Sequence, residues 1–168
     1  MTDQPPAADV LETLAARFPG LETSEYRGQT RIVVGEAASL EILSFLAAAG
    51  FDLLVDVTCV DYLEYRGATR RYGLVYQLVA TATARRLTVR VFVDDPDPTV
   101  RSVVGLWRSA EWLEREVWDM FGIHFTGHPD LRRLLMPEQF AAHPLRKDYP
   151  LQGRGERHNF PVLTREDG

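Results

Sequence analysis

Histidine and carboxylate side chains are the groups of this sequence whose types and spacing could bind a metal ion or transfer protons. His124 and His128 are four residues apart, which on a helix would place two imidazoles on one face. Gly122, Gly127 and Pro129 interrupt any such helix, and a catalytic metal needs about three converging ligands. We therefore expect no metal site, and we predict that these histidines form hydrogen bonds in turns.

Two carboxylates, Asp56 and Asp61, flank the end of an expected strand and could form an acid and base pair. A turn at Asp61 and Tyr62 is the simpler interpretation. The sequence contains no Gly-rich phosphate loop, no nucleophile elbow and no cluster of Cys and His with metal-ligand spacing. Its single cysteine, Cys59, cannot by itself hold an iron–sulfur cluster, which needs about four thiolates. These features predict a chain without an active site of its own.

The densest charged segment surrounds Arg115, which follows Glu111 by four residues and precedes Asp119 by four. On a helix these side chains share one face, so composition indicates a solvated ladder of ion pairs, each contributing about 0.3–0.5 kcal/mol. The same region contains all three tryptophans of the chain, Trp107, Trp112 and Trp118. Clustered tryptophans occur both in cores and in interface centres, and the sequence leaves both possibilities open.

Hydropathy and cap signals predict the elements that must position these residues. Helices are expected over 10–18, 37–49, 99–107 and 110–121. Thr99 and Ser109 are expected to cap the last two, and Gly50 and Gly122 to end the second and the fourth. Strand patterns predict a hairpin over 24–34 that turns near Gly28, followed by a meander of strands over 53–60, 71–80 and 86–93.

The order of these elements predicts a two-layer α+β domain over 1–122. We expect a mixed or antiparallel sheet of about five strands with helices on one face, followed by a long irregular C-terminal arm, 123–168. In the last predicted strand, apolar residues alternate with polar ones, which indicates one buried and one solvated face. The alternating apolar residues are Leu87, Val89, Val91 and Val93.

Prolines divide the segment 123–168, called the arm below, into pieces too short for regular helices. Its leucines and aromatic residues are too apolar for a chain that stays solvated, so the arm needs a surface on which to bury them. The residues alone leave open whether that surface belongs to the same chain or to another protein. The proline positions are Pro129, Pro137, Pro144, Pro150 and Pro161.

Charge and hydropathy restrict the partners of the chain. The net charge is −5 and the pI is near 5.4, which argues against binding to nucleic acid or anionic lipid. The basic pairs Arg132-Arg133 and Arg146-Lys147 are interrupted by acidic residues and favour a protein partner instead. The sequence has no run of about 20 apolar residues and no signal-peptide pattern, so we expect any membrane attachment to depend on other proteins.

Two segments carry a resemblance to a known family. They are ERE-x-x-DMFGI-x-F-x-GHPDLRRLL at 114–135 and HPLRKDYPL at 143–151. Together with Val60-Asp61-Tyr62-Leu63 and the segment 72–79, they make the chain similar to the C subunit of NADH:quinone oxidoreductase, respiratory complex I. The resemblance covers roughly 8–155. Equivalent subunits occur in ferredoxin-dependent photosynthetic complexes, in F420-dependent dehydrogenases and in membrane-bound hydrogenases, so the electron donor stays open.

The resemblance implies a structural subunit on the cytoplasmic side of the cell membrane, attached to the membrane only through the complex. It implies that this chain binds no cofactor and is inactive alone, while FMN, iron–sulfur clusters, NADH and quinone belong to the whole complex. The D subunit of the complex would be the chief partner, with the B subunit and others nearby. By the same resemblance we assign eleven residues to contacts between subunits or to ordering the arm: Glu114, Arg115, Glu116, Asp119, His128, Arg132, Arg133, Arg146, Lys147, Asp148 and Tyr149.

Overall fold

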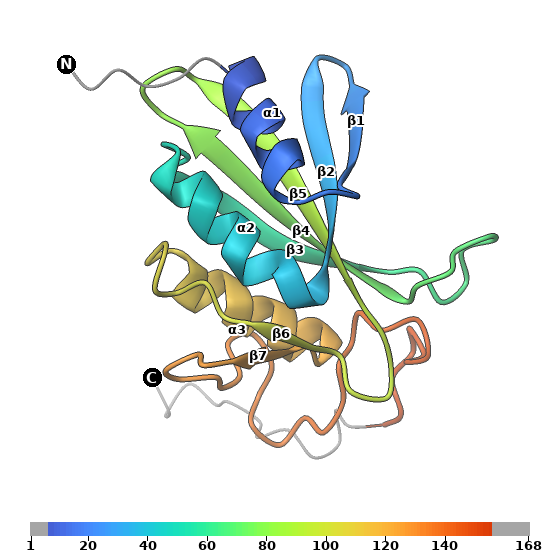
Figure 1. Ribbon diagram of the computed structural model, residues 1–168. Helices are drawn as coiled ribbons and strands as arrows, with labels where there is room; N and C mark the ends of the chain where they lie inside the picture. Colours follow the sequence, from blue (N-terminus) through green and yellow to red (C-terminus); the bar gives the residue numbers. More distant parts are fainter. Residues whose placement is uncertain (1–6, 156–168) are drawn as a thin grey trace.

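The computed structural model describes residues 7–155, which form three helices and two sheets (Figure 1). The helices are α1 (Ala7–Arg17), α2 (Glu36–Ala48) and α3 (Ala110–Phe121). The main sheet consists of β1 (Glu22–Tyr26), β2 (Gln29–Gly35), β3 (Leu53–Asp61), β4 (Tyr72–Ala80) and β5 (Arg85–Val93). The small sheet consists of β6 (Thr99–Arg101) and β7 (His124–Thr126).

The main sheet is mixed, with the strand order β1-β2-β5-β4-β3. β3, β4 and β5 form the predicted antiparallel meander, and β1 and β2 form the predicted hairpin around Gly28, whose φ is +73°. β2 runs parallel to β5, which brings the hairpin beside the meander. This topology leaves β1 and β3 as the two edge strands, and it confirms the predicted α+β fold class.

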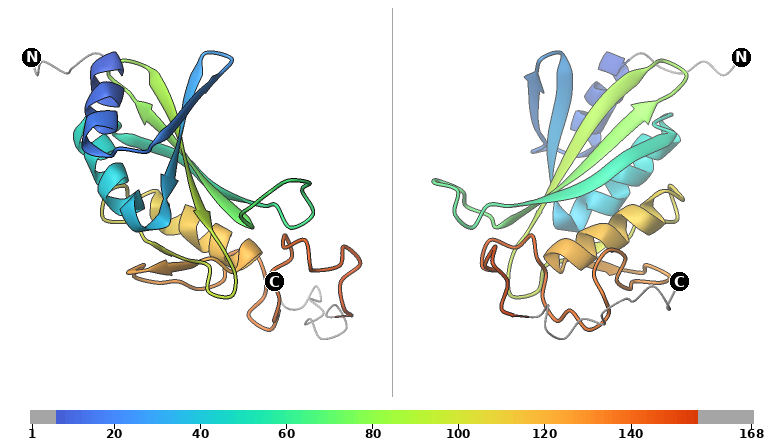
Figure 2. Two further views of the ribbon diagram at one scale, coloured as in Figure 1. Left: turned by 45° about the vertical axis from the view of Figure 1, so that its right-hand side comes forward. Right: turned by 180° about the vertical axis from the view of Figure 1, so that it is seen from behind.

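The helices lie on one face of the main sheet (Figures 1 and 2). The four apolar residues predicted to alternate along β5 are all at most 4% exposed. The opposite face was expected to be solvated, and this is wrong near the sheet centre, where Val75 and Thr88 are also buried. Thr88 is held there by a cross-strand contact, because its hydroxyl donates to the Gln77 side chain of β4 at 3.2 Å.

The segment predicted as a helix over 99–107 is instead the short strand β6 followed by turns. Thr99 does not cap a helix, because its hydroxyl donates to the Asp97 carboxylate at 2.7 Å. β6 pairs in parallel with β7, and this pairing buries Val100 and Phe125 in the hydrophobic core. Pairing with a strand distant in sequence therefore overrides the local cap signal.

Helix α3 has the predicted bounds but a different beginning. The Ser109 hydroxyl was expected to cap it, whereas it donates to the Leu54 carbonyl oxygen at 3.0 Å and so ties α3 to β3. Gly122 ends the helix in the left-handed conformation, as predicted, with φ +76°. Of the tryptophans, Trp107 belongs to the core and donates its indole N–H to the Phe51 carbonyl, whereas Trp112 is 56% exposed.

Candidate functional site: two buried carboxylates that hold the arm

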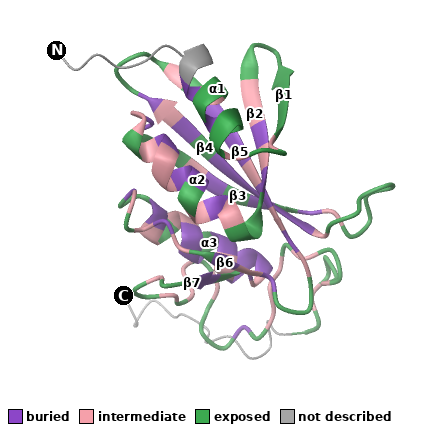
Figure 3. Cartoon of the chain, viewed as in Figure 1, coloured by how far each residue is buried: buried purple, intermediate pink, exposed green. Residues whose placement is uncertain are grey.

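The described part of the arm, 123–155, lies against α3 and against one end of the main sheet (Figure 2). Ile123 and Phe125, at its beginning, belong to the hydrophobic core. Beyond β7 the described chain has no regular elements. Figure 3 shows that α3 is buried along most of its length, so it lies between the sheet and the arm.

The first anchor of the arm is Asp119, on the last turns of α3. Its side chain is fully buried, and one carboxylate oxygen accepts the backbone N–H groups of three consecutive arm residues. These donors are Leu134 at 3.0 Å, Leu135 at 2.7 Å and Met136 at 2.9 Å. The other oxygen pairs with the Arg133 guanidinium at 2.5 Å. A single carboxylate therefore fixes the path of the backbone over 133–136.

The hydrogen bonds keep Asp119 ionised although it is buried. Burial alone would raise its pKa, but the three backbone N–H donors and Arg133 outweigh this effect and hold the pKa below its ordinary value. Arg133 also donates to the Ala142 carbonyl at 3.0 Å and lies over the ring of Phe140. The pair thus connects α3 to two separate parts of the arm.

Arg115 is buried, and it does not form the solvated ladder that composition indicated. Its guanidinium donates to the carbonyl oxygens of Arg132 at 3.2 Å and Arg133 at 3.0 Å, and no ion pair joins it to Glu111 or Asp119 among the described residues. The expectation fails because the arm covers this face of α3. The ring of Trp112 lies beneath the guanidinium, with 4.9 Å from its centroid to Cζ.

Glu114 is fully buried on the face of α3 that meets the chain after β6. Its carboxylate accepts the Ser102 hydroxyl and the Val103 backbone N–H, both at 2.7 Å. Burial raises the pKa of Glu114 to about 7, and the two hydrogen bonds only partly oppose the rise. Glu114 therefore orders the segment between β6 and α3 rather than the arm.

Two histidines of the arm form hydrogen bonds near turns, as predicted for His128, whereas the same prediction is wrong for His124, which lies in strand β7 and pairs with Thr99. His128 accepts the Asp130 backbone N–H at Nδ1 and donates from Nε2 to the Glu111 carbonyl, both at 3.0 Å. His143 Nδ1 donates to the backbone carbonyl of Asp119 at 3.0 Å. Burial lowers the pKa of His143, which keeps this ring neutral near pH 7.

The His143 ring lies directly on Gly122. A Cβ atom at this glycine would be 2.6 Å from Cδ2 of the ring, closer than real Cβ contacts. The glycine therefore serves two purposes: it adopts the left-handed backbone that ends α3, and it leaves room for the imidazole.

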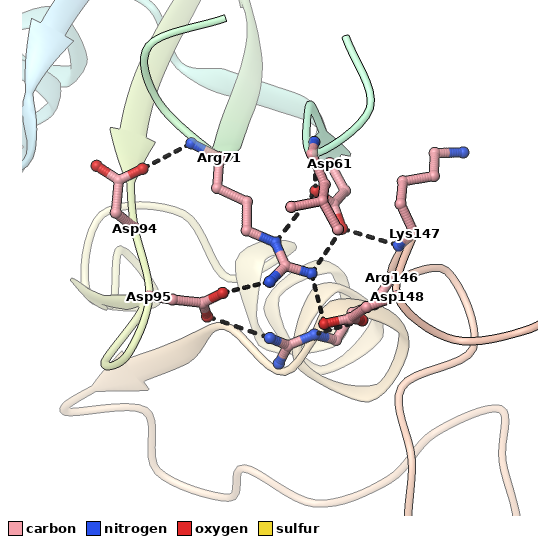
Figure 4. Close-up of polar contacts among 8 residues, drawn as sticks. Asp61, Arg71, Asp94, Asp95, Arg146, Lys147 and Asp148 are labelled. Atoms are coloured by element: carbon pink, nitrogen blue, oxygen red, sulfur yellow. Dashed lines mark hydrogen bonds and ion pairs between the residues drawn. The ribbon is translucent and has the colours of Figure 1, made fainter.

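The second anchor of the arm is Asp61, the last residue of β3 (Figure 4). Its side chain is fully buried and accepts the Lys147 backbone N–H at 2.9 Å and the Leu63 backbone N–H at 3.0 Å. Arg71 donates to both oxygens, from Nε at 3.3 Å and from Nη2 at 3.2 Å. Asp61 thus holds the turn after β3, as the sequence suggested, and it also holds the arm, which the sequence did not suggest.

Arg71 and Arg146 link this anchor to two further carboxylates (Figure 4). Arg71 pairs with Asp95 and with Asp148, the latter at 2.8 Å. Arg146 pairs with the same two residues, at 3.1 Å to Asp95 and 3.5 Å to Asp148. The network therefore joins three segments that are distant in sequence: the end of β3, the chain after β5 and the arm.

Strand register explains why these charges meet. In the meander Asp61 pairs with Tyr72 of β4, and Tyr72 pairs with Val93 of β5. The residue before β4, Arg71, therefore lies beside Asp61 and beside the acidic pair that follows β5. The sequence places opposite charges at the ends of neighbouring antiparallel strands, and this pattern could have predicted the cluster.

The network determines the ionisation of its members. Burial would raise the pKa of Asp61, but Arg71 and the backbone N–H groups of Lys147 and Leu63 hold it below its ordinary value. The hydrogen bond from Arg71 is the main reason that the pKa of Asp148 is also lowered. Both carboxylates stay charged at neutral pH, and donors occupy both oxygens of Asp61. Carboxylates with these properties hold segments of the structure together and do not act as an acid and base pair.

The other predicted contact residues differ in their exposure. Tyr149 packs its ring edge-on against Phe140, with 5.8 Å between the centroids. Arg132 is exposed and pairs with Asp130 at 2.8 Å. Glu116 and Lys147 are exposed, although the backbone of Lys147 is held by Asp61. Five of the eleven predicted residues therefore lie at the contact between α3 and the arm, namely Arg115, Asp119, His128, Arg132 and Arg133. Arg146, Lys147 and Asp148 lie instead where the arm meets Asp61, Arg71 and Asp95.

The described residues contain neither a cluster of metal-ligating side chains nor a helix able to span a membrane. Over 7–155, no three His, Cys, Asp or Glu side chains are grouped so that they could hold a metal ion. Cys59 is buried, and burial raises its pKa to about 12. None of the helices in the same range has both the length and the apolar character needed to cross a membrane.

Comparison with known proteins gives consistent matches. The family model described as "Respiratory-chain NADH dehydrogenase, 30 Kd subunit" matches residues 32–155. The C subunit of NADH-quinone oxidoreductase from Trichlorobacter lovleyi is 44% identical over 148 residues, which are 86% of this chain and 90% of the relative. Subunit 5 of NADH-quinone oxidoreductase from Thermus thermophilus is 43% identical over 163 residues, which are 94% of this chain and 75% of the relative.

Solved structures agree with the sequence matches. A trypsin-resistant fragment of Nqo5 is 37% identical, with a TM-score of 0.68 over 74% of this chain and 98% of the fragment. A chain of an archaeal membrane-bound sulfane sulfur reductase is 21% identical, with a TM-score of 0.76 over 94% of this chain and 93% of that one, which shows the shared fold alone. The family match covers well over half of the chain. The chain therefore belongs to the family of the respiratory-chain NADH dehydrogenase 30-kDa subunit, whose bacterial members include the C subunit of NADH-quinone oxidoreductase.

Proposed function

We propose that this chain is a structural subunit of the peripheral arm of proton-translocating NADH-quinone oxidoreductase and that it stabilises the quinone-reducing module through its own C-terminal arm. One observation carries the proposal: the arm is fixed to its own domain by Asp119 and Asp61 while it exposes large apolar side chains. These are Leu135 at 59%, Leu145 at 51% and Leu151 at 105% exposure. Such side chains favour association, because a partner removes them from water.

The fixed path of the arm supports this role energetically. A segment that is disordered before binding must be ordered when the partner arrives, which costs part of the interaction free energy. Here the hydrogen bonds to the two carboxylates order the backbone in advance. The exposed Trp112 lies beneath Arg115, which holds the same segment, and it enlarges the apolar surface with a residue type that is enriched at interface centres.

We infer that the D subunit of the enzyme is the chief partner and that the B subunit and other peripheral subunits lie nearby, on the cytoplasmic side of the membrane. We further infer that this chain itself binds no flavin, cluster, nicotinamide or quinone. FMN, the iron–sulfur clusters and the sites for NADH and quinone then belong to other subunits. The clamp-like chemistry of Asp61 and Asp119, whose oxygens accept hydrogen bonds from fixed donors, supports a structural rather than a catalytic role.

The proposal is tested by purifying a tagged copy of the chain from its native host after mild detergent extraction and identifying the co-purified proteins by mass spectrometry. The B and D subunits are expected among them. The isolated chain is expected to show no turnover with NADH and a quinone. Turnover by the isolated chain, or purification without any other subunit of the enzyme, would contradict the proposal.

The role of the arm is tested by placing a charge on its exposed surface. Leu145→Glu is expected to lower the amount of chain recovered in the complex, while the circular dichroism spectrum of the purified chain stays unchanged. Tyr26→Glu is the matched control, because Tyr26 is equally exposed at 51% but lies at the end of β1, on the hairpin. Equal recovery of both variants would show that the arm does not mediate assembly.

A further inference from the structure

The face of the main sheet opposite the helices carries a groove that the two anchors do not use. The loop 62–71, between β3 and β4, lies over this face, and the groove between loop and sheet has a volume of about 460 Å³. Its walls are mainly aromatic and aliphatic, with two arginines. The residues that matter most are Val33, Tyr62, Tyr65, Arg70, Arg90 and Phe92.

Arg90 is the unusual member of this lining. In the sheet it pairs with Val33 of β2 and with Val75 of β4, so its stem lies between two valines on the same face. Its Nε–H is buried and has no hydrogen-bond partner among the described residues. A buried donor on a charged group costs free energy when it is left unpaired, and such donors normally have an acceptor.

The other charges of the groove do not supply that acceptor. Arg70 is already held, by the Asp94 carboxylate and by the Phe92 carbonyl at 3.0 Å. Glu22 lies on the rim in β1, two strands away from β5, and no ion pair joins it to Arg90 in the described part of the chain. Within that part of the chain, the positively charged Arg90 at the base of the groove therefore has no acidic partner.

The walls of the groove are formed in advance. The Tyr62 ring lies 6.0 Å from the Phe92 ring and 5.8 Å from the Tyr65 ring, measured between centroids. Gly73 allows this packing, since a Cβ atom there would be 2.9 Å from Tyr62 Cε2 and 3.1 Å from Phe92 Cε1. The exposed Val60 pairs with Gly73 and extends the apolar wall toward the free edge of β3.

We propose that this groove receives an acidic side chain from a short segment of a neighbouring subunit, whose carboxylate pairs with the Arg90 guanidinium. A carboxylate matches the guanidinium in charge and in planar, two-pronged geometry. Apolar residues beside the acid would pack against the aromatic wall. A protein segment fits better than a small molecule, because Tyr65 is 69% exposed and the groove does not enclose its contents as ligand pockets do. The inference rests on the proposed function, which supplies the neighbouring subunit.

The test uses the assembled complex. Arg90→Gln is expected to reduce retention of the chain in the purified complex by more than about tenfold, because it removes one partner of a desolvated pair. Arg86→Gln is the matched control, since Arg86 lies on the same strand and face but is exposed and outside the groove. Equal retention of the two variants would overturn the inference.

A second measurement identifies the occupant without altering Arg90. A photoreactive phenylalanine derivative replaces Tyr65 in the complex, and mass spectrometry locates the peptide that it captures. The expected product is a segment of another subunit that contains Asp or Glu. Capture within this chain, capture of a segment without an acidic residue, or no capture would overturn the inference. If other subunits co-purify while both tests fail, only the groove assignment is wrong; if none co-purifies, the proposed function is wrong.

Discussion

Asp119→Asn is the change that most directly tests whether a single buried carboxylate orders the arm. The variant keeps the size of the side chain but removes its charge and one acceptor oxygen. The amide oxygen can still accept some of the backbone N–H groups, whereas the amide nitrogen then faces the Arg133 guanidinium, which is only 12% exposed. One member of a buried ion pair is thereby left without its partner.

The expected loss follows from that pair. Removing one partner of a buried pair destabilises by about 3–5 kcal/mol. We expect the lower end, about 3 kcal/mol, because Arg133 keeps its bond to the Ala142 carbonyl at 3.0 Å. Such a loss is a large fraction of the roughly 5–15 kcal/mol by which domains are stable. Urea unfolding of the purified chain, followed by circular dichroism, measures the difference in the free energy of unfolding.

The contribution of Asp119 also has a predictable pH dependence. The pKa of the folded state lies below the ordinary value of about 3.9, because hydrogen bonds outweigh burial. The stabilisation is therefore complete above the ordinary value and is lost as the pH falls through the folded pKa. The Asp119→Asn variant should lack this acid-sensitive part of the free energy of unfolding.

Glu116→Gln is the control for Asp119→Asn, because Glu116 is exposed on the same helix and should change stability by less than about 0.5 kcal/mol. Limited proteolysis provides a second readout, since a released arm should be cut faster at its basic residues. If Asp119→Asn behaves like Glu116→Gln in both measurements, the carboxylate does not hold the arm and the reasoning is wrong.

Three further predictions concern the other contacts of the arm and α3. Asp61→Asn should lower the free energy of unfolding, measured with urea, by about 1–3 kcal/mol. This is less than for Asp119→Asn, because Arg71 keeps two other carboxylate partners, and an equal or larger loss would contradict the prediction. Gly122→Ala should destabilise more than Gly127→Ala, since both have positive φ but only Gly122 lacks space for a Cβ atom; equal melting temperatures would exclude the ring contact as the cause. The pKa of Glu114 is raised to about 7, so the contribution of its protonated carboxyl group to stability is complete at low pH and is lost as the pH rises toward 7. Glu114→Gln should therefore gain stability relative to the unaltered chain between about pH 5 and pH 8.

The parts of the fold that depend on local patterns were predictable from the sequence. Alternation along β5 and the glycines at positions 50 and 122 determine where strands and helices lie, because each acts within a few residues. The helix predicted over 99–107 failed for the opposite reason. Its residues form a strand with β7, about twenty-five residues later in the chain, and no local signal reports such a partner.

In the candidate site, too, some residues could be identified from the sequence and others could not. The resemblance pointed to Asp119, Arg133 and Arg115, whereas composition alone assigned Arg115 to a solvated ladder, because a helix pattern does not reveal what covers the helix. Asp61 and Arg71 were missed as anchors of the arm, since their role depends on the register between β3 and β4. Reading the charges at the ends of antiparallel strands together would have recovered them.

Both anchors hold the arm mainly through its backbone, at positions 134–136 and 147. Any residue with an amide hydrogen can meet this requirement, and only proline cannot. The side chains of Leu135 and Lys147, which are exposed, are consequently free to diverge, as long as the route of the chain is kept. A family built in this way can adapt its outer surface to different neighbours by point substitution, without having to evolve a new scaffold each time.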